Sequence, residues 1–376
     1  MGNVKSRMAI AAGHICLDIT PAFPNEKIRR IDEMFVPGRL IQMGEADVHT
    51  GGAVANTGLA MKILGADVRL MGKVGKDAFG DLVLSKLEEY NASEGMIVSE
   101  GSATSYSVVL APVGIDRIFL HCSGANDTFV MDDIDFSLVG DAALFHFGYP
   151  PLMKNMYSDH GRELVQLFQK VKSMDVATSL DFAAIDENAE VGKVDWEGIL
   201  AQVLPYVDFF VPSVEELAYM LDRPRYQEWM KRAAGGDVTS VLDIEKDVRP
   251  LADRLLDMGA KVILIKCGAP GLYLRTGGQE RISQIGGGLP ETMIKWDNLE
   301  HFEKSYRPDR ILSGTGAGDT SIAAFLCSVL NSNTWQEAMQ YAAGTGASCV
   351  AAYDALSGLL TFDQLRARIN AGWEKN

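Results

Sequence analysis

A glycine-rich segment near the C-terminus combines residue types that could hold an anion and move a proton. It reads Ser313-Gly314-Thr315-Gly316-Ala317-Gly318-Asp319 and runs directly into the apolar stretch TSIAAFLCSVL. Three glycines allow a tight backbone turn, and a helix over the apolar stretch would direct its unpaired N–H groups at a ligand. Asp319 stands at the mouth of this anion site, where a carboxylate is well suited to accept a proton from an attacking hydroxyl. The alternative interpretation is that Asp319 only caps the helix.

The segment matches neither of the two common glycine-rich nucleotide motifs. It lacks the third glycine of the dinucleotide fingerprint and lies far from the first strand and helix, where that fingerprint belongs. The phosphate-binding loop GxxxxGK[ST] is absent, because Gly75-Lys76 is followed by Asp77 and has no upstream glycine. We therefore interpret the segment as an anion site that carries its own carboxylate.

Two further positions suggest a polyol as the second reactant. Gly51-Gly52 precedes an expected helix that carries Asn56 one turn in, and an amide both donates to and accepts from hydroxyl groups. The alternative is a tight loop whose Asn satisfies a neighbouring strand. Asp18 is expected at the end of the first strand, the edge where an open parallel sheet presents ligand groups. A proton acceptor, an anion site and a polyol-binding loop together predict phosphoryl transfer to a hydroxyl.

The elements that must position these residues alternate between short strands and helices. This alternation predicts a parallel sheet with helices on both faces. KVILIKC and GLYLRT, separated by GAP, predict a hairpin. The helices are expected over residues 53–64, 78–90, 162–172 and 196–204, and from 214 onwards.

Four stretches depart from the alternation. Residues 19–50 and 104–123 mix polar and apolar residues with period two, which is typical of strands with one wet face. We expect them to form a small sheet that lies over the site as a lid. Residues 222–250 are charged and expected to be helical, whereas 276–310, with GGG and two prolines, read as a long loop without an assigned role.

The composition narrows the class of protein. The chain has 376 residues, with 35 lysines and arginines against 50 acidic residues, a net charge of −15. This argues against binding to nucleic acids or to anionic membranes, which both need clustered positive charge. No uncharged stretch reaches 18 residues, so no membrane span is expected. The five cysteines stand singly in apolar runs, as expected for reduced thiols of a cytoplasmic protein.

With these motifs in hand, the sequence resembles the ribokinase-like (PfkB) family of carbohydrate kinases from about residue 8 to 360. The resemblance rests on GGAVANTGLA through LGADVRLMGKVGKDAFGD, on GIDRIFLHCSGAND and on GTGAGDTSIAAF. Ala53 after the paired glycines resembles the fructokinase and 2-keto-3-deoxygluconate kinase branches, because ribose-specific members carry Lys there. The family implies a single domain over residues 1–376, with a three-layer α/β/α core and mainly parallel sheet plus a small β-sheet lid.

The same resemblance implies ATP as the phosphoryl donor, Mg²⁺ as the cofactor, a small sugar as the acceptor and lid sheets that pair into a homodimer. It implies that Asp319 is the general base. The N–H groups of the anion hole would belong to Gly316, Ala317 and Gly318. The sugar contacts would be Asp18, Gly52 and Asn56. The nucleotide contacts would be Gly268, Gly271, Thr315 and Glu216, the last organising Mg²⁺ through water.

Two departures from the family pattern matter. Ser213 replaces the Asn that usually stands three residues before the glutamate, so the phosphate and metal contact there is weakened or rebuilt. Ser313 replaces an Asp that helps to hold a monovalent cation in potassium-activated relatives, which argues against such activation. Both departures motivate one alternative, a catalytically silent sensor that binds sugar or nucleotide. The other is an adenosine-type nucleoside kinase, with Tyr106 and Phe119 of the lid around the base.

A sugar acid or sugar phosphate would require a cationic side chain in the acceptor pocket. The candidates near the relevant segments are Arg39, Lys73, Lys76 and Arg117. Each is equally consistent with an ordinary charge on a solvated surface.

Overall fold

The computed structural model describes residues 7–28, 30–113, 117–286, 288–289 and 291–376. Within them, nine strands form one sheet: β1 (Ala9–Gly13), β4 (Val68–Gly75), β5 (Met96–Ser99), β8 (Leu144–Gly148), β9 (Ala177–Asp181), β10 (Phe209–Phe210), β11 (Val262–Lys266), β12 (Gly271–Thr276) and β13 (Glu300–Lys304). Their order is β13-β12-β11-β10-β9-β8-β1-β4-β5. The strands from β5 to β11 pair in parallel, and β12 and β13 add an antiparallel edge. The predicted mainly parallel sheet is confirmed.

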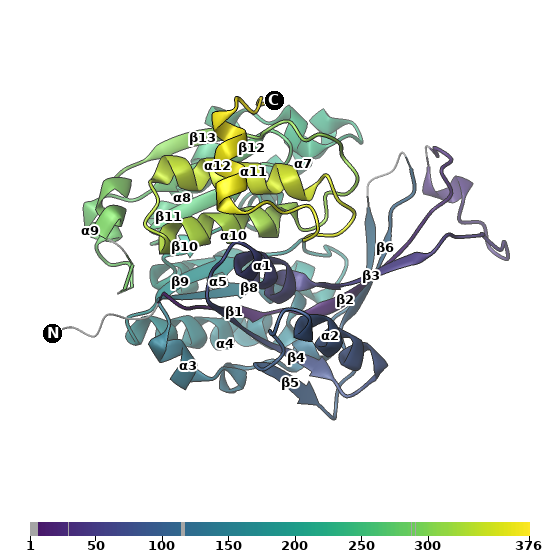
Figure 1. Ribbon diagram of the computed structural model, residues 1–376, viewed down its shortest axis with the longest axis horizontal. Coiled ribbons are helices and arrows are strands. Elements are labelled where there is room, and N and C mark those ends of the chain that lie inside the picture. Colours follow the sequence, from purple (N-terminus) through teal and green to yellow (C-terminus); the bar gives the residue numbers. More distant parts are fainter. Residues whose placement is uncertain (1–6, 29, 114–116, 287, 290) are drawn as a thin grey trace.

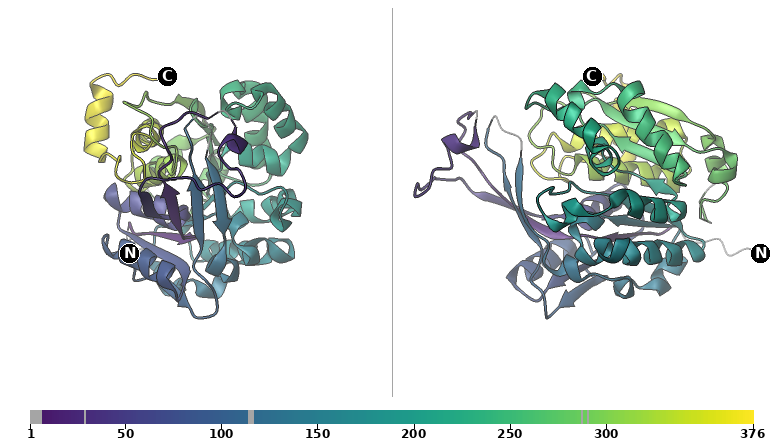
Figure 2. Two further views of the ribbon diagram at one scale, coloured as in Figure 1. Left: turned by 90° about the vertical axis from the view of Figure 1, so that its right-hand side faces the viewer. Right: turned by 180° about the vertical axis from the view of Figure 1, so that it is seen from behind.

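Helices cover both faces of this sheet, which gives three layers (Figure 1, Figure 2). One face carries α1 (Gly52–Ile63), α2 (Ala78–Glu88), α10 (Ala317–Leu330), α11 (Trp335–Cys349) and α12 (Phe362–Asn370). The other carries α3 (Phe136–Asp141), α4 (Lys154–Ser173), α5 (Trp196–Val203), α6 (Val214–Leu221), α7 (Arg223–Ala233) and α8 (Arg249–Asp257). No helix among the described residues has the length and apolar character needed to cross a bilayer.

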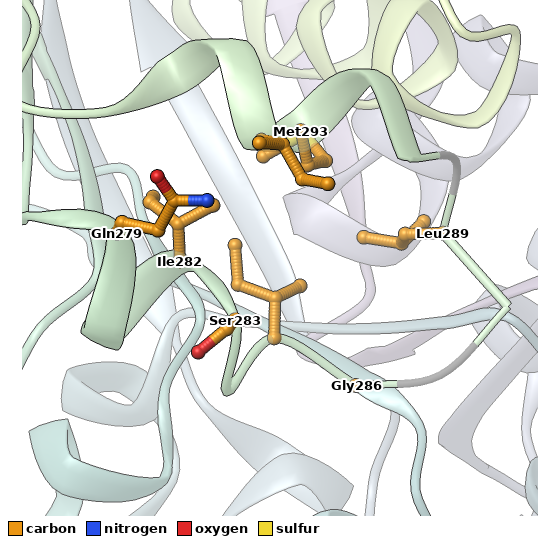
Figure 3. A pocket seen from close by; sticks show the side chains of 8 residues that line it. Gln279, Ile282, Ser283, Gly286, Leu289 and Met293 are labelled. Carbon is orange, nitrogen blue, oxygen red and sulfur yellow. The ribbon is translucent and has the colours of Figure 1, made fainter.

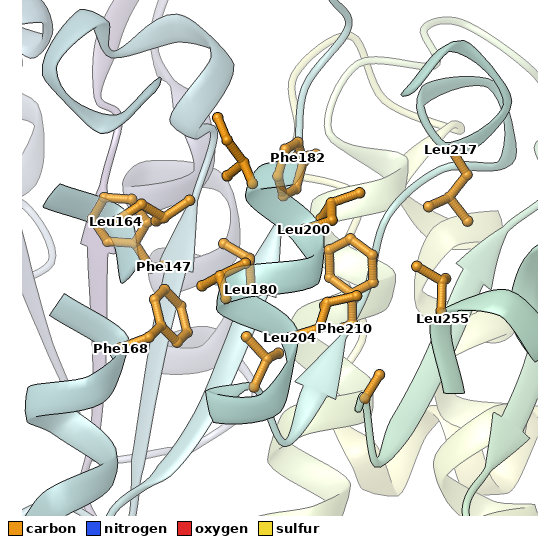
Figure 4. Close-up of a cluster of buried hydrophobic side chains, with 14 of the residues drawn as sticks. Phe147, Leu164, Phe168, Leu180, Phe182, Leu200, Leu204, Phe210, Leu217 and Leu255 are labelled. Carbon is orange, nitrogen blue, oxygen red and sulfur yellow. The ribbon is translucent and has the colours of Figure 1, made fainter. Parts of the chain in front are cut away.

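The buried strand residues divide between the two faces with period two. In β8, Leu144 packs towards α1 and α10, whereas Phe145 and Phe147 pack towards α4. On the α4 side, aromatic and leucine side chains interlock between strands and helices (Figure 4). Phe147 and Phe168 meet edge to face, with ring centroids 6.4 Å apart. Each such side chain contributes about 1.5–3 kcal/mol by burial, so the strand ends that carry functional groups start from a rigid platform.

A second sheet projects from one side of the core (Figure 1). Its strands are β2 (Cys16–Pro21), β3 (Ala46–Gly51), β6 (Tyr106–Leu110) and β7 (Ile118–Cys122), in the order β3-β2-β6-β7. The predicted small sheet is therefore present, and its strands come from the two expected stretches and their margins. Tyr106 of β6 packs edge to face on Phe79 of α2, with centroids 5.5 Å apart, which attaches the sheet to the core.

The predicted place of Asp18 at the end of the first strand is wrong. β1 ends at Gly13, and Asp18 lies within β2 of the second sheet. Gly13 makes this early exit possible: its φ is +118°, and a Cβ there would lie 2.5 Å from the carbonyl oxygen of Gly148. The apolar run of the sequence thus contains two strands of different sheets with a turn between them.

The structure confirms some of the other predicted elements and contradicts one. Helices α1, α2, α5 and α6 lie where they were predicted, and the β11–β12 hairpin is confirmed. Residues 222–250 are helical for much of their length, as expected. The long loop predicted for 276–310 is wrong, because it contains α9 (Gln279–Ile282), a 3₁₀ turn over Glu291–Trp296 and strand β13. The sequence of β13 is EHFEK. An edge strand tolerates such charged residues, and they hide the apolar pattern by which a strand is usually predicted.

Residues around α9 line a partly open pocket of about 160 Å³ (Figure 3). Its lining is mainly aliphatic and comes from Ile282, Ile285, Leu289 and Met293, with Gln279 and Ser283 at the side. This lining suits the internal packing of the segment rather than the recognition of a polar substrate.

Candidate active site

The glycine-rich turn leads into α10 through a left-handed residue. Gly316 is the N-cap with φ +75°, and a Cβ there would lie 2.3 Å from the Cβ of Ala355. A side chain is therefore excluded by both conformation and space. α10 begins at Ala317, so the N–H groups of its first turn, which have no partner within the helix, start at this point. The sequence predicted this turn and helix correctly.

Asp319 is the third residue of α10, and its side chain is held by residues from other elements. Only 5% of the residue is exposed. Asn56 Nδ2 of α1 donates to Oδ2 at 3.0 Å, and the Tyr149 hydroxyl donates to Oδ1 at 2.5 Å. Both hydrogen bonds come from side chains outside α10 and not from N–H groups at the start of the helix. They therefore do not support the alternative in which Asp319 only caps α10. Tyr149 directly follows β8 and was missed by sequence reasoning.

The paired glycines at the start of α1 let other groups come close. A Cβ on Gly51 would lie 2.2 Å from Asp18 Oδ2, and one on Gly52, whose φ is +84°, would lie 2.5 Å from His14 Nδ1. Burial is the main cause of a raised pKa at Asp18, and the charge of Asp319 acts in the same direction. Asp18, Gly52, Asn56 and Asp319 are therefore brought together, although Asp18 arrives from the second sheet.

Two histidines that the sequence did not single out lie beside this group. The rings of His14 and His121 are 5.2 Å apart between centroids, and His14 is 5.8 Å from the ring of Tyr149. Burial lowers the pKa of both imidazoles, so they are neutral at physiological pH. Ser107 Oγ lies 3.0 Å from His121 Nδ1. Within the described residues, His14 Nδ1 and His121 Nε2 have no hydrogen-bond partner.

A buried ion pair lies on the other side of the turn. Lys266 Nζ at the end of β11 donates to Asp181 Oδ1 at the end of β9, at 2.6 Å. The stem of Lys266 lies 3.1 Å from the position that a Cβ on Gly318 would take, so the ammonium group is beside the turn. Burial raises the pKa of the Asp181 carboxyl, and the positive charge of Lys266 beside it acts in the opposite direction. Its Oδ2 is buried without a partner in the described part of the chain.

Glu216 belongs to the same cluster of charges. It is in the first turn of α6, and its charge raises the pKa of Lys266, as does that of Asp181. Ser213 is the N-cap of this helix: its hydroxyl accepts from the N–H of Glu216 at 3.3 Å, while Glu216 Oε2 accepts from the N–H of Ser213 at 2.8 Å. This reciprocal cap occupies the hydroxyl that replaces the family's Asn. Lys266 stands beside Ser213 across a strand bridge.

Gly268 and Gly271 form the turn of the β11–β12 hairpin that follows Lys266. Their φ values are +64° and +145°. A Cβ would lie 2.4 Å from Thr239 Oγ1 at the first and 2.1 Å from the carbonyl oxygen of Glu303 at the second. Packing alone therefore requires glycine at both positions, whatever they bind.

Of the four candidate cations, Arg117 lies at the turn. It comes from the segment between β6 and β7, and its Nη1 donates to Thr315 Oγ1 at 2.7 Å. Lys73 pairs with Asp133 at 2.9 Å. Lys76 pairs with Glu100 at 2.6 Å, and Arg39 is exposed. This hydrogen bond joins the segment between β6 and β7 to the glycine-rich turn.

Comparisons with known proteins bear on the family and the fold of the chain. The family model described as pfkB family carbohydrate kinase matches residues 15–361. An uncharacterized sugar kinase of Archaeoglobus fulgidus is 22% identical over 80% of this chain and 98% of its own. Arabidopsis thaliana ribokinase complexed with ribose and ATP superposes with a TM-score of 0.68 at 18% identity, covering 96% of this chain and 98% of its own. An Escherichia coli putative ribokinase II in complex with ATP and Mg²⁺ gives 0.70 at 20% identity, covering 97% and 100%.

Proposed function

The chain belongs to the PfkB family of carbohydrate kinases, and on that premise we propose that it transfers the γ-phosphoryl group of ATP to a hydroxyl of a small sugar, with Asp319 as general base. One observation carries the proposal. The Asp319 carboxylate lies in the first turn of α10, at the exit of the glycine-rich turn, and is bonded to Asn56 of the predicted polyol loop. This contact supports the assignment of the proton acceptor, the anion site and the polyol contact to one point.

The turn and α10 supply the electrostatics of the transfer. As the phosphoryl group moves, negative charge is spread over its oxygens, and fixed N–H donors stabilise that charge without reorganisation. We assign this task to the N–H groups of Gly316, Ala317 and Gly318. The 14-residue helix α10 directs the positive end of its dipole at the same place. The ammonium group of Lys266, whose stem lies against Gly318, stands on the far side of the turn, where it is paired with Asp181.

The residues on that side suit a magnesium ion held through water. Mg²⁺ prefers oxygen donors and keeps several waters. Asp181 offers a buried oxygen without a partner in the described structure, and Glu216 offers a second carboxylate in the same cluster. When bound, Mg²⁺ would neutralise phosphate charge. Gly268, Gly271 and Thr315 are the proposed nucleotide contacts, and Ser313 in place of Asp makes dependence on a monovalent cation unexpected.

The acceptor side favours an uncharged polyol. Asp18 and Asp319 lie close enough for their charges to interact, and a sugar acid or sugar phosphate would be repelled by both. Carboxylates, the Asn56 amide and neutral imidazoles are suitable partners for hydroxyl groups. A nucleoside acceptor is less well supported, because the ring of Tyr106 is already packed on Phe79.

We propose that the second sheet acts as a lid. Its contact from Arg117 to Thr315 would close the site against water, which competes with the sugar as acceptor. Phe119 and Leu120 of β7 are about half exposed, at 50% and 53%. An exposed apolar strand of this kind supports pairing of two lid sheets in a homodimer.

The experiment is a panel of neutral sugars, sugar acids, sugar phosphates and nucleosides, tested for stimulated release of ADP from Mg²⁺-ATP. We expect stimulation by a neutral sugar, with one sugar phosphate formed for each ADP, as measured by mass spectrometry. Stimulation by nucleosides would instead favour the nucleoside kinase. Binding of sugar and ATP without any stimulated ADP release would favour the silent sensor.

A further inference from the structure

Tyr149 occupies a backbone conformation that bulky residues rarely adopt. Its φ and ψ are 71° and 44°, in the left-handed region, between the end of β8 and Pro150-Pro151. For a residue with a side chain this conformation costs about 1–2 kcal/mol relative to the right-handed helical region. Its N–H donates to the carbonyl oxygen of Asp181 at 3.2 Å, which ties the strained residue to the end of the neighbouring strand. The strained backbone directs the phenol at Asp319.

Tyr149 and Asn56 each donate a hydrogen bond to a different oxygen of the Asp319 carboxylate. The Tyr149 hydroxyl donates to Oδ1, and Asn56 Nδ2 donates to Oδ2. The ionisable groups around the phenol are Asp319 from α10, Asp181 from β9, Glu216 from α6 and His14 after β1. Burial, followed by the charges of Asp319 and Asp181, raises the pKa of Tyr149 well above its usual value. The phenol therefore keeps its proton and acts only as a donor.

Asn56 and Tyr149 differ in the hydrogen-bonding capacity that remains available to a substrate. Asn56 is at the predicted polyol position, and its amide has two N–H bonds and a carbonyl oxygen to share with an incoming hydroxyl. Tyr149 has a single O–H, which is already used on Oδ1. An acceptor hydroxyl would therefore reach the carboxylate at Oδ2, beside Asn56, while Oδ1 stays occupied.

We propose that Tyr149 is a positioning residue that holds Oδ1 of Asp319, so that Oδ2 is the atom that takes the proton. The inference rests on the proposed function. In the transfer, the acceptor O–H bond breaks and its proton passes to Oδ2. The acceptor oxygen bonds to the γ-phosphorus, and the bond from that phosphorus to the bridging oxygen breaks, which releases ADP.

The test compares Tyr149→Phe with the wild type, using kcat and KM for sugar and ATP across pH 5–9. Loss of one hydrogen bond to a charged group should lower kcat by about 10- to 100-fold, with KM changed by less than about threefold. The acid limb of the kcat profile should move to higher pH, because a carboxylate that loses a donor holds its proton more tightly. Tyr157→Phe, which removes a phenol hydroxyl from α4, is the matched control and should leave the profile unchanged.

A purely structural role for Tyr149 would lower the melting temperature and leave the pH profile in place. A second variant, Tyr149→3-fluorotyrosine, keeps the ring and makes the hydroxyl a stronger donor, so the acid limb should move to lower pH. Asn56→Ala should mainly raise KM for the sugar.

An unchanged kcat and pH profile in Tyr149→Phe, beside an active wild type, would overturn the role of Tyr149 alone. A raised KM for the sugar at unchanged kcat would also overturn it, because the phenol would then bind substrate. A wild type without acceptor-dependent turnover would overturn both this role and the proposed function.

Discussion

Asp319 takes its geometry from residues that lie far from it in the sequence. Asn56 is 263 positions away and Tyr149 is 170 positions away. Motif reasoning identified Asp319 and Asn56, because glycines and helix starts mark such sites locally. It missed Tyr149 and Lys266, which lie at strand ends without a motif of their own. The local signals were a Tyr before two prolines and a Lys closing an otherwise apolar strand.

Ser213 shows what a residue type alone leaves undetermined. The sequence marked it as a departure that weakens or rebuilds a phosphate contact. In the structure its hydroxyl is used in the cap of α6, and the cation beside it is Lys266. The hydroxyl is thus engaged within the helix cap, and a reciprocal cap is itself readable as Ser followed three residues later by Glu.

His146 carries a prediction about pH. It is fully buried in β8, its Nδ1 lies 2.9 Å from Ser179 Oγ, and burial, aided by the charge of Lys266, lowers its pKa to about 3. Between pH 6.5 and 3 the unfolded chain therefore binds a proton that the native protein does not. Because protons favour the unfolded chain in this range, the free energy of unfolding falls as pH falls from 6.5 towards 3. Above pH 6.5, His146 is neutral in both states and this loss is absent.

The variant His146→Asn removes this group and keeps a polar atom near Ser179. Relative to the variant, the wild type should lose about 1.4 kcal/mol of unfolding free energy per pH unit between about pH 6 and pH 4. Urea unfolding at several pH values measures the difference. Curves that stay parallel would mean that His146 titrates normally in the folded protein.

At the scale of elements, the turn before α10 depends on glycine for two separable reasons, conformation and space. Gly316 has φ +75° and lies against Ala355, whereas Gly372 has φ +87° with nothing within 4 Å of a Cβ. Alanine at either position should lower the free energy of unfolding by about 1 kcal/mol, because its side chain disfavours the left-handed backbone. At Gly316 the new methyl group would also clash with Ala355, so the start of α10 or the segment that carries Ala355 must move.

We predict that Gly316→Ala lowers kcat by about 100-fold, the effect of shifting catalytic groups by about 1 Å. Gly372→Ala should lose a comparable part of its stability from conformation and keep its turnover. Steady-state kinetics and thermal melting of both variants provide the measurement. Equal turnover in the two variants would show that the turn does not need its present geometry.

The edge of the large sheet shows where element prediction fails. β13 pairs with β12 through five residue pairs, yet its sequence offers one aromatic residue among charges. A buried strand can be predicted from its continuous apolar run, whereas an edge strand is exposed along one side and tolerates charge. The same segment appears as a loop in the sequence because GGG and Pro290 dominate its first half.

For the whole molecule, the layered core follows from the alternation of strands and helices, and the likeness to solved ribokinases shows that fold. The packing of α1 against α10 does not follow from any local pattern, because the two helices stand at opposite ends of the chain. That contact unites Asn56 with Asp319. The hydrogen bond from Arg117 to Thr315 adds the second sheet to the same point, so three distant parts of the chain contribute to one site.

The turnover of Asp319→Asn tests the central claim most directly. The variant keeps the shape of the side chain and loses the proton acceptor, so kcat should fall by about 10²- to 10⁴-fold. Calorimetric titration should still show ATP and sugar binding within a few-fold of the wild type. Asp363→Asn, with its side chain 94% exposed on α12, controls for the loss of one negative charge. Near-normal turnover in Asp319→Asn would contradict the account.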